Sequence, residues 1–245
     1  TYKSFLYNRL QRKGSDSKDI HRLAARDRHV FAALMLAHGH GDGLVTGATR
    51  KSAHVLERLN HVFDANAKHG AVGITALLHK GRIVFIGDTL VHEWPNEEDL
   101  ANIAEKGAKV ARHMGLEPRV AFVSFSTFGY PVSERAEKMQ RAPDVLDARG
   151  VDFEYEGEMT VDVALNAESQ KNYSFSRLTG PANILVVPAR HSASISVKLM
   201  QEMAGATVIG PILTGLDKSI QICSTTSTAN DILNMAILAA CKVGE

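Results

Sequence analysis

The chain has 245 residues, of which 44% are hydrophobic and 22% are charged, and its formal net charge is +1. This length fits one large or two smaller α/β lobes with a substantial core, and the composition is ordinary for a globular protein. The low net charge argues against a dominant nucleic-acid or membrane-surface role, because both need a concentrated basic face. No apolar run reaches membrane-spanning length, and no signal peptide is visible.

The cysteine content bears on the cellular compartment. Only Cys223 and Cys241 occur, and their spacing matches no metal motif. This favours a reducing cytoplasm over a disulfide-stapled secreted protein. The sequence opens at Thr1 without a methionine, inside a predicted helix, so we expect a piece of a longer polypeptide.

Helical spacing of apolar residues dominates the first quarter of the chain. The pattern predicts a helix over 2–13 that ends at Gly14, a second helix capped by Ser17, a third that begins at Asp27, and a fourth over 51–64. A change of lobe is expected near residues 68–70.

A glycine-rich segment, HGHGDGLVTG over 38–47, lies between the third and fourth helices. It misses the dinucleotide-binding pattern G-x-G-x-x-G because Thr46 occupies the third glycine position, and it follows a helix rather than a strand. Its glycines permit either close approach of the backbone to a ligand or a tight turn, and both interpretations stay open. His38, His40 and Asp42 offer no fourth ligand nearby, so we expect no metal here.

The middle of the chain alternates between strand and helix patterns. Two apolar runs joined by Lys80-Gly81 predict a hairpin, and Asn96 is expected to start a helix that Gly115 ends. Further strands are predicted at 120–125, 151–155 and 184–187, with a helix from Ser133 to near Gly150.

The last stretch carries a cluster of hydroxyl side chains. A strand over 206–210, a turn with Pro211 and Gly215, and a strand over 219–223 precede the run STTST at 224–228, and a helix over 230–242 follows it. The hydroxyls can cap the helix, or the helix start can hold an anion. Apolar residues lie all round 232–240, so this helix is expected in a core or an interface.

Alternating helices and strands predict an α/β fold with a parallel or mixed sheet, in which ligands bind where strands end. The candidate positions are 124–129, 188–194 and 224–231, all rich in hydroxyls and poor in strong bases. No nucleophile elbow, phosphate-binding loop or paired-carboxylate signature is present. Glu154, Glu156 and Glu158 alternate along the chain, which favours a solvated face.

Several segments resemble the phosphate acetyltransferase/butyryltransferase family. They are GDGLVTGAT at 41–49, VAFVSFSTFG at 120–129, EMTVDVAL at 158–165, ATVIGPILTGLDK at 206–218 and the helix from Asp231. Within this family the chain is most similar to the acetyltransferase-like C-terminal domain of bacterial multidomain NADP-dependent malic enzymes, through GATR at 47–50, GRIVFIGDTLVHEWP at 81–95, HSASISVKLMQE at 191–202 and GLDKSIQI at 215–222.

The resemblance implies a two-lobed fold like that of isocitrate and isopropylmalate dehydrogenases, with the N-terminal part of the first lobe missing. The first lobe would combine 1–67 with 212–245, and the second would be 68–211, with acetyl-CoA in a cleft between them. NADP and a divalent metal would belong only to the absent malic domain, and a homo-oligomer is expected. The acetyl-CoA contacts would be Asp42, Thr46, Gly47, Ser126, Thr127, Ser224, Thr225, Thr226 and Asp231.

Departures from the family pattern bear on catalysis. Ser224 and Asp231 match the transferase serine and aspartate, but Thr225 and Thr226 replace an arginine and a glycine. Glu57 stands at the position of a second arginine, and Arg58 lies about 100° round the helix from it. Acyl transfer from acetyl phosphate needs preorganised cationic donors, so these changes predict a degenerate site.

These observations favour a non-catalytic, acetyl-CoA-sensing regulatory domain attached to an oxidoreductase that converts malate to pyruvate. The alternative is an active phosphate acetyltransferase, with Asp231 as the base toward the CoA thiol and Ser224 as a donor to the carbonyl. A third interpretation is a lobe used only for oligomerisation.

Overall fold

The computed structural model describes residues 2–63 and 70–243. The chain divides into two compact units, one made of Thr1–Ala71 with Ile212–Val243 and the other of Val72–Pro211. The lobe change expected near 68–70 falls mostly on 64–69, outside the described residues.

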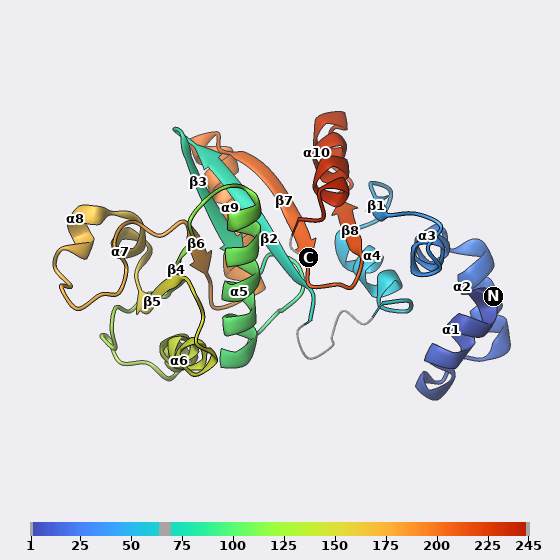
Figure 1. The fold of residues 1–245 in the computed structure, drawn as a ribbon, viewed down its shortest axis with the longest axis horizontal. Coiled ribbons are helices and arrows are strands. Elements are labelled where there is room, and N and C mark those ends of the chain that lie inside the picture. The colour runs from blue at the N-terminus through green and yellow to red at the C-terminus, as the bar shows by residue number, and fades with distance from the viewer. Residues whose placement is uncertain (1, 64–69, 244–245) are drawn as a thin grey trace. The chain divides into compact units, whose positions relative to one another are not determined.

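The first unit packs helices around a pair of parallel strands. Strands β1 and β8 run side by side from the pair Gly43 and Ser219 to the pair Gly47 and Cys223. The elements of this unit are α1 (Tyr2–Leu10), η1 (Gln11–Lys13), α2 (Ser17–Arg26), α3 (Arg28–Ala37), β1 (Gly43–Gly47), α4 (Ser52–Leu59), β8 (Ser219–Cys223) and α10 (Ala229–Ala240) (Figure 1).

Helix boundaries in the first unit follow the capping side chains. Asp27 accepts hydrogen bonds from the His29 and Val30 amides and starts α3, as predicted. For α2 the predicted cap is wrong by one residue, because the carboxylate of Asp16, rather than the Ser17 hydroxyl, accepts from the Asp19 amide. Helix α4 stops at Leu59, earlier than predicted, because the chain tightens there into a turn.

The second unit is built on a mixed sheet with the strand order β5-β4-β6-β3-β2-β7. Pairs β4–β5, β4–β6 and β3–β6 are parallel, and β2–β3 is antiparallel. Its elements are β2 (Val72–His79), β3 (Arg82–Gly87), α5 (Glu97–His113), β4 (Arg119–Val123), α6 (Glu134–Arg149), β5 (Glu154–Met159), α7 (Val161–Leu165), α8 (Ala167–Gln170), β6 (Ile184–Val186), α9 (Arg190–Ala204) and β7 (Thr207–Thr214), which continues into the first unit from Ile212 (Figure 1).

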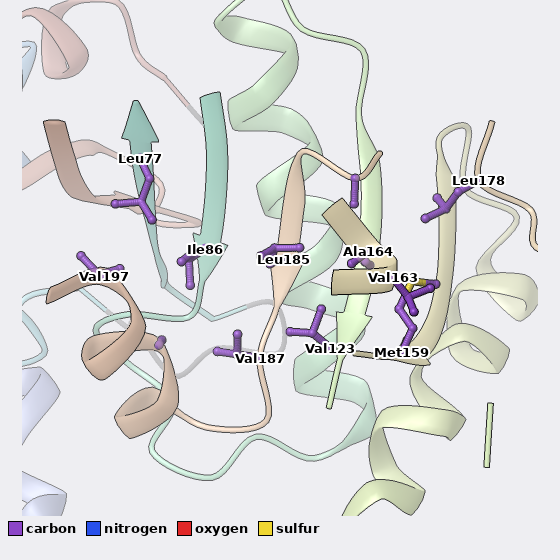
Figure 2. Packing of buried hydrophobic residues seen from close by; sticks show 13 residues of the cluster. Leu77, Ile86, Val123, Met159, Val163, Ala164, Leu178, Leu185, Val187 and Val197 are labelled. Carbon is purple, nitrogen blue, oxygen red and sulfur yellow. The ribbon is translucent and has the colours of Figure 1, made fainter. Parts of the chain in front are cut away.

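The two faces of this sheet are covered differently. Helix α5 presses closely on one face, where a Cβ on Gly87 would lie 2.6 Å from the Ile103 side chain and one on Gly107 would lie 2.9 Å from Ile184. Helices α7 and α9 lie on the opposite face (Figure 2). Their buried cluster consists of Leu77, Ile86, Ala121, Val123, Met159, Val163, Ala164, Leu178, Ala182, Leu185, Val187, Ala193 and Val197.

Several local predictions are confirmed. Lys80 and Gly81 connect β2 and β3 with positive φ angles of 48° and 74°, as a tight hairpin requires. Asn96 starts α5 in a reciprocal capping box with Asp99.

Among the helices of residues 2–63 and 70–243, none combines the length and apolar character needed to cross a membrane.

Two strand predictions are wrong. The strand predicted at 151–155 lies at Glu154–Met159, because pairing with β4 fixes its register. Pro211 does not form a turn but lies inside β7, at the edge of the sheet. Proline is tolerated on an edge strand because a missing amide donor there need not break a ladder hydrogen bond.

A buried aspartate organises the loop between β3 and α5. Asp88 has 1% of its side chain exposed and accepts hydrogen bonds from the amides of Gly73, Leu90, Val91 and His92. It also binds the imidazole of His92, with 2.7 Å between Oδ2 and Nδ1. This hydrogen bond is the main cause that raises the pKa of His92 above 6.5, against the opposing effect of burial.

This pair predicts pH-dependent stability. A histidine whose pKa is higher in the folded state stabilises the fold fully below pH 6.5, and the contribution disappears as pH rises through the folded-state pKa. We expect His92→Gln to remove about 1 kcal/mol of unfolding free energy at low pH and little at high pH. Urea titrations of both proteins across this window measure the difference. An equal loss at every pH would contradict the prediction.

Candidate functional site

The carboxyl ends of β1 and β8 border a cavity of about 250 Å³ in the first unit. Its lining includes Arg28, His29, Thr46, Gly47 and Cys223. Thr46 and Gly47 were predicted as ligand contacts from the sequence, whereas Arg28 and His29 come from the start of α3. Strand ends of a parallel pair are where ligands bind in α/β folds, so this cavity is the candidate site of the first unit.

His29 is a buried polar residue of this cavity. It has 4% of its surface exposed, and its Nδ1 is hydrogen-bonded to Thr46 Oγ1 at 2.7 Å. Its Nε2 is buried and has no hydrogen-bond partner within the described part of the chain. Burial is the main cause that lowers the pKa of His29, the charge of Asp27 opposes it, and the charge of Arg28 acts in the same direction as burial. A neutral imidazole at neutral pH therefore keeps one unused hydrogen-bonding atom here.

Charges of both signs act on this imidazole. Among these charges, Asp27 has the largest effect on the pKa of His29, and Arg28 and Arg50 act in the opposite direction. Within residues 2–63 and 70–243, neither arginine forms an ion pair with a carboxylate. Arg28 lines the cavity, so its guanidinium group is available to an anion there.

Gly47 lets the two strands approach at the cavity. Its φ is +111°, and a Cβ placed there would lie 2.2 Å from the Cys223 carbonyl oxygen. The amide of Ala48 donates to that oxygen at 3.0 Å. The close approach at this glycine is to the chain itself, so it does not decide whether the segment also approaches a ligand.

The hydroxyl cluster follows Cys223 directly. The Ser224 hydroxyl lies 3.0 Å from Thr226 Oγ1 and 3.3 Å from Ser227 Oγ, and it accepts from the Thr226 amide. Thr225 is exposed, and its side chain has no hydrogen bond among the described residues. Ser224 and Thr226 are thus hydrogen-bonded to each other, whereas the Thr225 side chain faces solvent.

Asp231 acts as a structural cap. The Thr228 hydroxyl accepts from the Asp231 amide, and Asp231 Oδ2 accepts from the Thr228 amide and hydroxyl at 2.8 and 2.9 Å. This capping box starts α10 as the sequence predicted. Burial, followed by the charge of Asp231, raises the pKa of Cys223, so this thiol stays protonated.

Three other residues discussed from the sequence, Asp42, His38 and His40, do not line the cavity. Asp42 precedes β1 at its opposite end, about 16 Å along the strand from Gly47. His38 and His40 bind the Leu34 carbonyl and the Tyr2 hydroxyl, with distances of 2.8 and 2.6 Å. Among the described residues, no group of three or more metal-type side chains converges.

The SFST segment belongs to the second unit, after β4. Ser126 is fully buried, and its hydroxyl has no hydrogen-bond partner in the described chain. The Thr127 hydroxyl is used at the start of α7, where it accepts from the Thr160 amide at 3.1 Å. Ser126, not Thr127, therefore keeps an unused polar atom.

Glu158 supports this segment and corrects a prediction. Its carboxylate accepts from the Gly129 amide at 3.0 Å, and its carbonyl accepts from the Phe128 amide at 2.8 Å. Glu158 is 1% exposed, and Glu156 is 7% exposed and paired with Arg177. The solvated face predicted for these glutamates is wrong, because their partners come from distant parts of the chain.

Glu57 and Arg58 on α4 also differ in role. Glu57 has 62% of its side chain exposed. Arg58 lies 3.3 Å from Asp27 in an ion pair that links α4 to the start of α3. Arg58 therefore links two helices.

The model of one protein family, described as "Phosphate acetyl/butaryl transferase", matches residues 1–240. The chain belongs to this family. The match confirms the resemblance drawn from the sequence motifs.

The sequence relatives of this chain are of two kinds. An NADP-dependent malic enzyme of Rhizobium meliloti (strain 1021) is 50% identical over 99% of this chain, which covers 32% of that enzyme. The phosphate acetyltransferase of Bacillus subtilis (strain 168) is 28% identical over 95% of this chain and 72% of its own length. The chain thus spans about a third of the malic enzyme that it matches.

Solved structures of the transferase family share the fold. A phosphotransacetylase from Streptococcus pyogenes superposes with a TM-score of 0.89 and 25% identity, covering 99% of this chain and 75% of that one. The predicted α/β, transferase-like fold is confirmed.

Sequence reasoning missed Arg28 and His29. Both directly follow the capping residue Asp27, where they look like ordinary first-turn residues. Their significance comes from Thr46, which lies 17 residues from His29 along the chain. No local pattern could reveal that contact.

The close approach at Gly47 predicts a sharp difference between two glycines of β1. Gly47→Ala should destabilise the first unit by about 2 kcal/mol or more, because the methyl group meets the Cys223 carbonyl and the positive φ is strained. Gly43→Ala is the control, since its Cβ would meet no atom closer than 3.5 Å. Denaturant unfolding of both variants measures the effect, and equal stabilities would contradict it.

Proposed function

We propose that this chain is an acetyl-CoA-binding regulatory domain of a cytoplasmic NADP-dependent malic enzyme. The observation that carries the proposal is the cavity at the ends of β1 and β8, which is lined by Arg28 and by His29 with its unused Nε2. The similarity to a malic enzyme over 99% of this chain supports attachment to a malate-oxidising domain. NADP and a divalent metal would belong to that domain.

The cavity fits one end of a CoA thioester. Its volume of about 250 Å³ is below that of pockets that enclose drug-sized molecules, about 300–1,000 Å³. An acetyl group or a single phosphate fits this space, and the rest of the ligand would lie outside it. The Ala229 and Asn230 amides, which open α10, have no acceptor within the helix and can donate to a phosphate oxygen.

The same geometry supports binding better than turnover. The Asp231 carboxylate is hydrogen-bonded within the capping box, and Thr225 supplies no positive charge. The base for the CoA thiol would thus already be hydrogen-bonded, and the cation that stabilises the developing negative charge would be missing. The second candidate, an active phosphate acetyltransferase, rests on the presence of Ser224 and Asp231.

Binding in this domain can regulate a distant reaction if the ligand prefers one state of the complete enzyme. Self-association is the second part of the proposal, because it would place several effector sites in one assembly. The exposed Ile232, Leu233 and Ile237 on α10 and the apolar face of α9 are surfaces that such an assembly could bury.

The primary experiment is calorimetric titration of the chain with acetyl-CoA, beside an assay for acetyl phosphate formation. Binding without turnover is expected. Turnover would favour the transferase. If the chain neither binds acetyl-CoA nor forms acetyl phosphate, only the oligomerisation hypothesis is left.

Thr225→Asp should weaken acetyl-CoA binding at least tenfold, because it adds a negative charge beside the helix start that receives the anion. Thr225→Ser is the matched control and should bind normally, since it keeps the hydroxyl of this predicted contact and adds no charge. In the complete polypeptide, the ratio of malate oxidation rates with and without acetyl-CoA should approach one for Thr225→Asp. An unchanged affinity would exclude this loop as the binding site.

A further inference from the structure

The buried imidazole of His29 has one nitrogen for which the fold supplies no partner. Its Nδ1 lies 2.7 Å from Thr46 Oγ1, whereas its Nε2 is buried and has no hydrogen-bond partner among the described residues. The His29 side chain lines the cavity at the ends of β1 and β8. Buried polar atoms are almost always hydrogen-bonded, so an unpaired one beside a cavity points to a ligand or a water molecule there.

The wall of the cavity favours an anion over water alone. The cavity of about 250 Å³ is several times larger than the roughly 30 Å³ that one water molecule occupies in the liquid, so a phosphate group fits. Arg28 precedes His29, lines the same cavity and forms no ion pair within residues 2–63 and 70–243. An acetyl group is uncharged and would leave this cation unpaired, whereas a phosphate oxygen can accept from it.

The charges around the imidazole come from the start of α3, from α4 and from the loop before α4. They are Asp27, Arg28, Arg50 and His54. Asp27 favours the protonated imidazole, but its carboxylate also pairs with Arg58 at 3.3 Å. The other three groups disfavour it and, together with the larger effect of burial, lower the pKa of His29. An anion at Nε2 would reverse this balance, because a nearby negative charge stabilises an imidazolium.

We propose that this cavity binds a phosphate group, with Arg28 and the protonated form of His29 as its two cationic partners. The imidazolium donates through Nδ1 to Thr46 and through Nε2 to a phosphate oxygen, so both ring nitrogens are paired. The imidazole takes up one proton from solvent when the anion enters. This inference rests on the proposed function, since it concerns the same cavity and assigns it to a phosphate of acetyl-CoA.

Sulfate is the first probe, because it remains a dianion near neutral pH and a proton taken up on binding must therefore go to the protein. Calorimetric titration of the chain in two buffers with different heats of ionisation counts this proton. Above the pKa of the unliganded His29, the sulfate dissociation constant should rise about tenfold per pH unit. In imidazole NMR spectra, the His29 pKa should rise when sulfate is added. This measurement needs no variant except to assign the signal.

Three variants separate the titrating group from the fixed charge. His29→Gln keeps a polar side chain but cannot take up a proton, so its sulfate affinity should fall at least tenfold near pH 6 and lose its pH dependence. His54→Gln is the matched control, since His54 acts on His29 from α4 but does not line the cavity, and it should retain the proton uptake. Arg28→Gln should weaken sulfate binding at every pH and also retain the uptake.

Acetyl-CoA titrated in the same two buffers distinguishes this inference from the proposed function. Binding with a rise in the His29 pKa supports both. Binding of acetyl-CoA without that rise refutes only the phosphate site at His29. Sulfate binding with proton uptake, but no binding of acetyl-CoA, refutes only the proposed function. The inference is overturned if neither sulfate nor acetyl-CoA raises the His29 pKa, or if His54→Gln abolishes the uptake and His29→Gln does not.

Discussion

The close contact between β1 and β8 at Gly47 is the constraint on which the first unit depends. Without a Cβ at this position the Cys223 carbonyl approaches the turning backbone and accepts from the Ala48 amide. Both strands therefore end at the same level, and the segments that leave them start side by side. Thr46 reaches His29 on one side, and the hydroxyl cluster leads into α10 on the other. The close contact at Gly47 thus positions the cavity, the cap of α10 and the strand pair together.

The charges at this site differ from those that the family resemblance implies. The positions likened to two family arginines hold Thr225 and Glu57, while Arg28 and Arg50 act on His29 from other elements and Asp27 acts against them. The Asp231 carboxylate is hydrogen-bonded to Thr228. Under the proposed function an anion would bind here without acyl transfer. Such a separation of binding from chemistry would suit a regulatory domain, since its effector must be released unchanged.

The second unit divides its sheet between a closed face and a partly open one. Gly87 and Gly107 allow α5 to lie close on one face, so that side is sealed by packing. On the other, α7 and α9 leave a groove between them, bordered by exposed apolar side chains.

The sequence by itself determined the features that depend on neighbouring residues. Periodicity located most helices and strands, turn chemistry located the Lys80-Gly81 hairpin, and capping patterns located the starts of α5 and α10. Motifs spread along the whole chain indicated the family, which the family model then confirmed. Each of these signals lies within a few residues of the feature that it predicts.

Only the tertiary structure decided the features that depend on distant partners. Alternating glutamates looked solvated, yet Glu158 is buried because the SFST segment, about 30 residues earlier, supplies the Gly129 amide that its carboxylate binds. Pro211 looked like a turn, yet it lies in β7 because an edge strand tolerates it. The unused atom of His29 is visible only once β1 lies against α3. Burial and pairing are properties of the assembled chain, and local periodicity does not encode which residues meet.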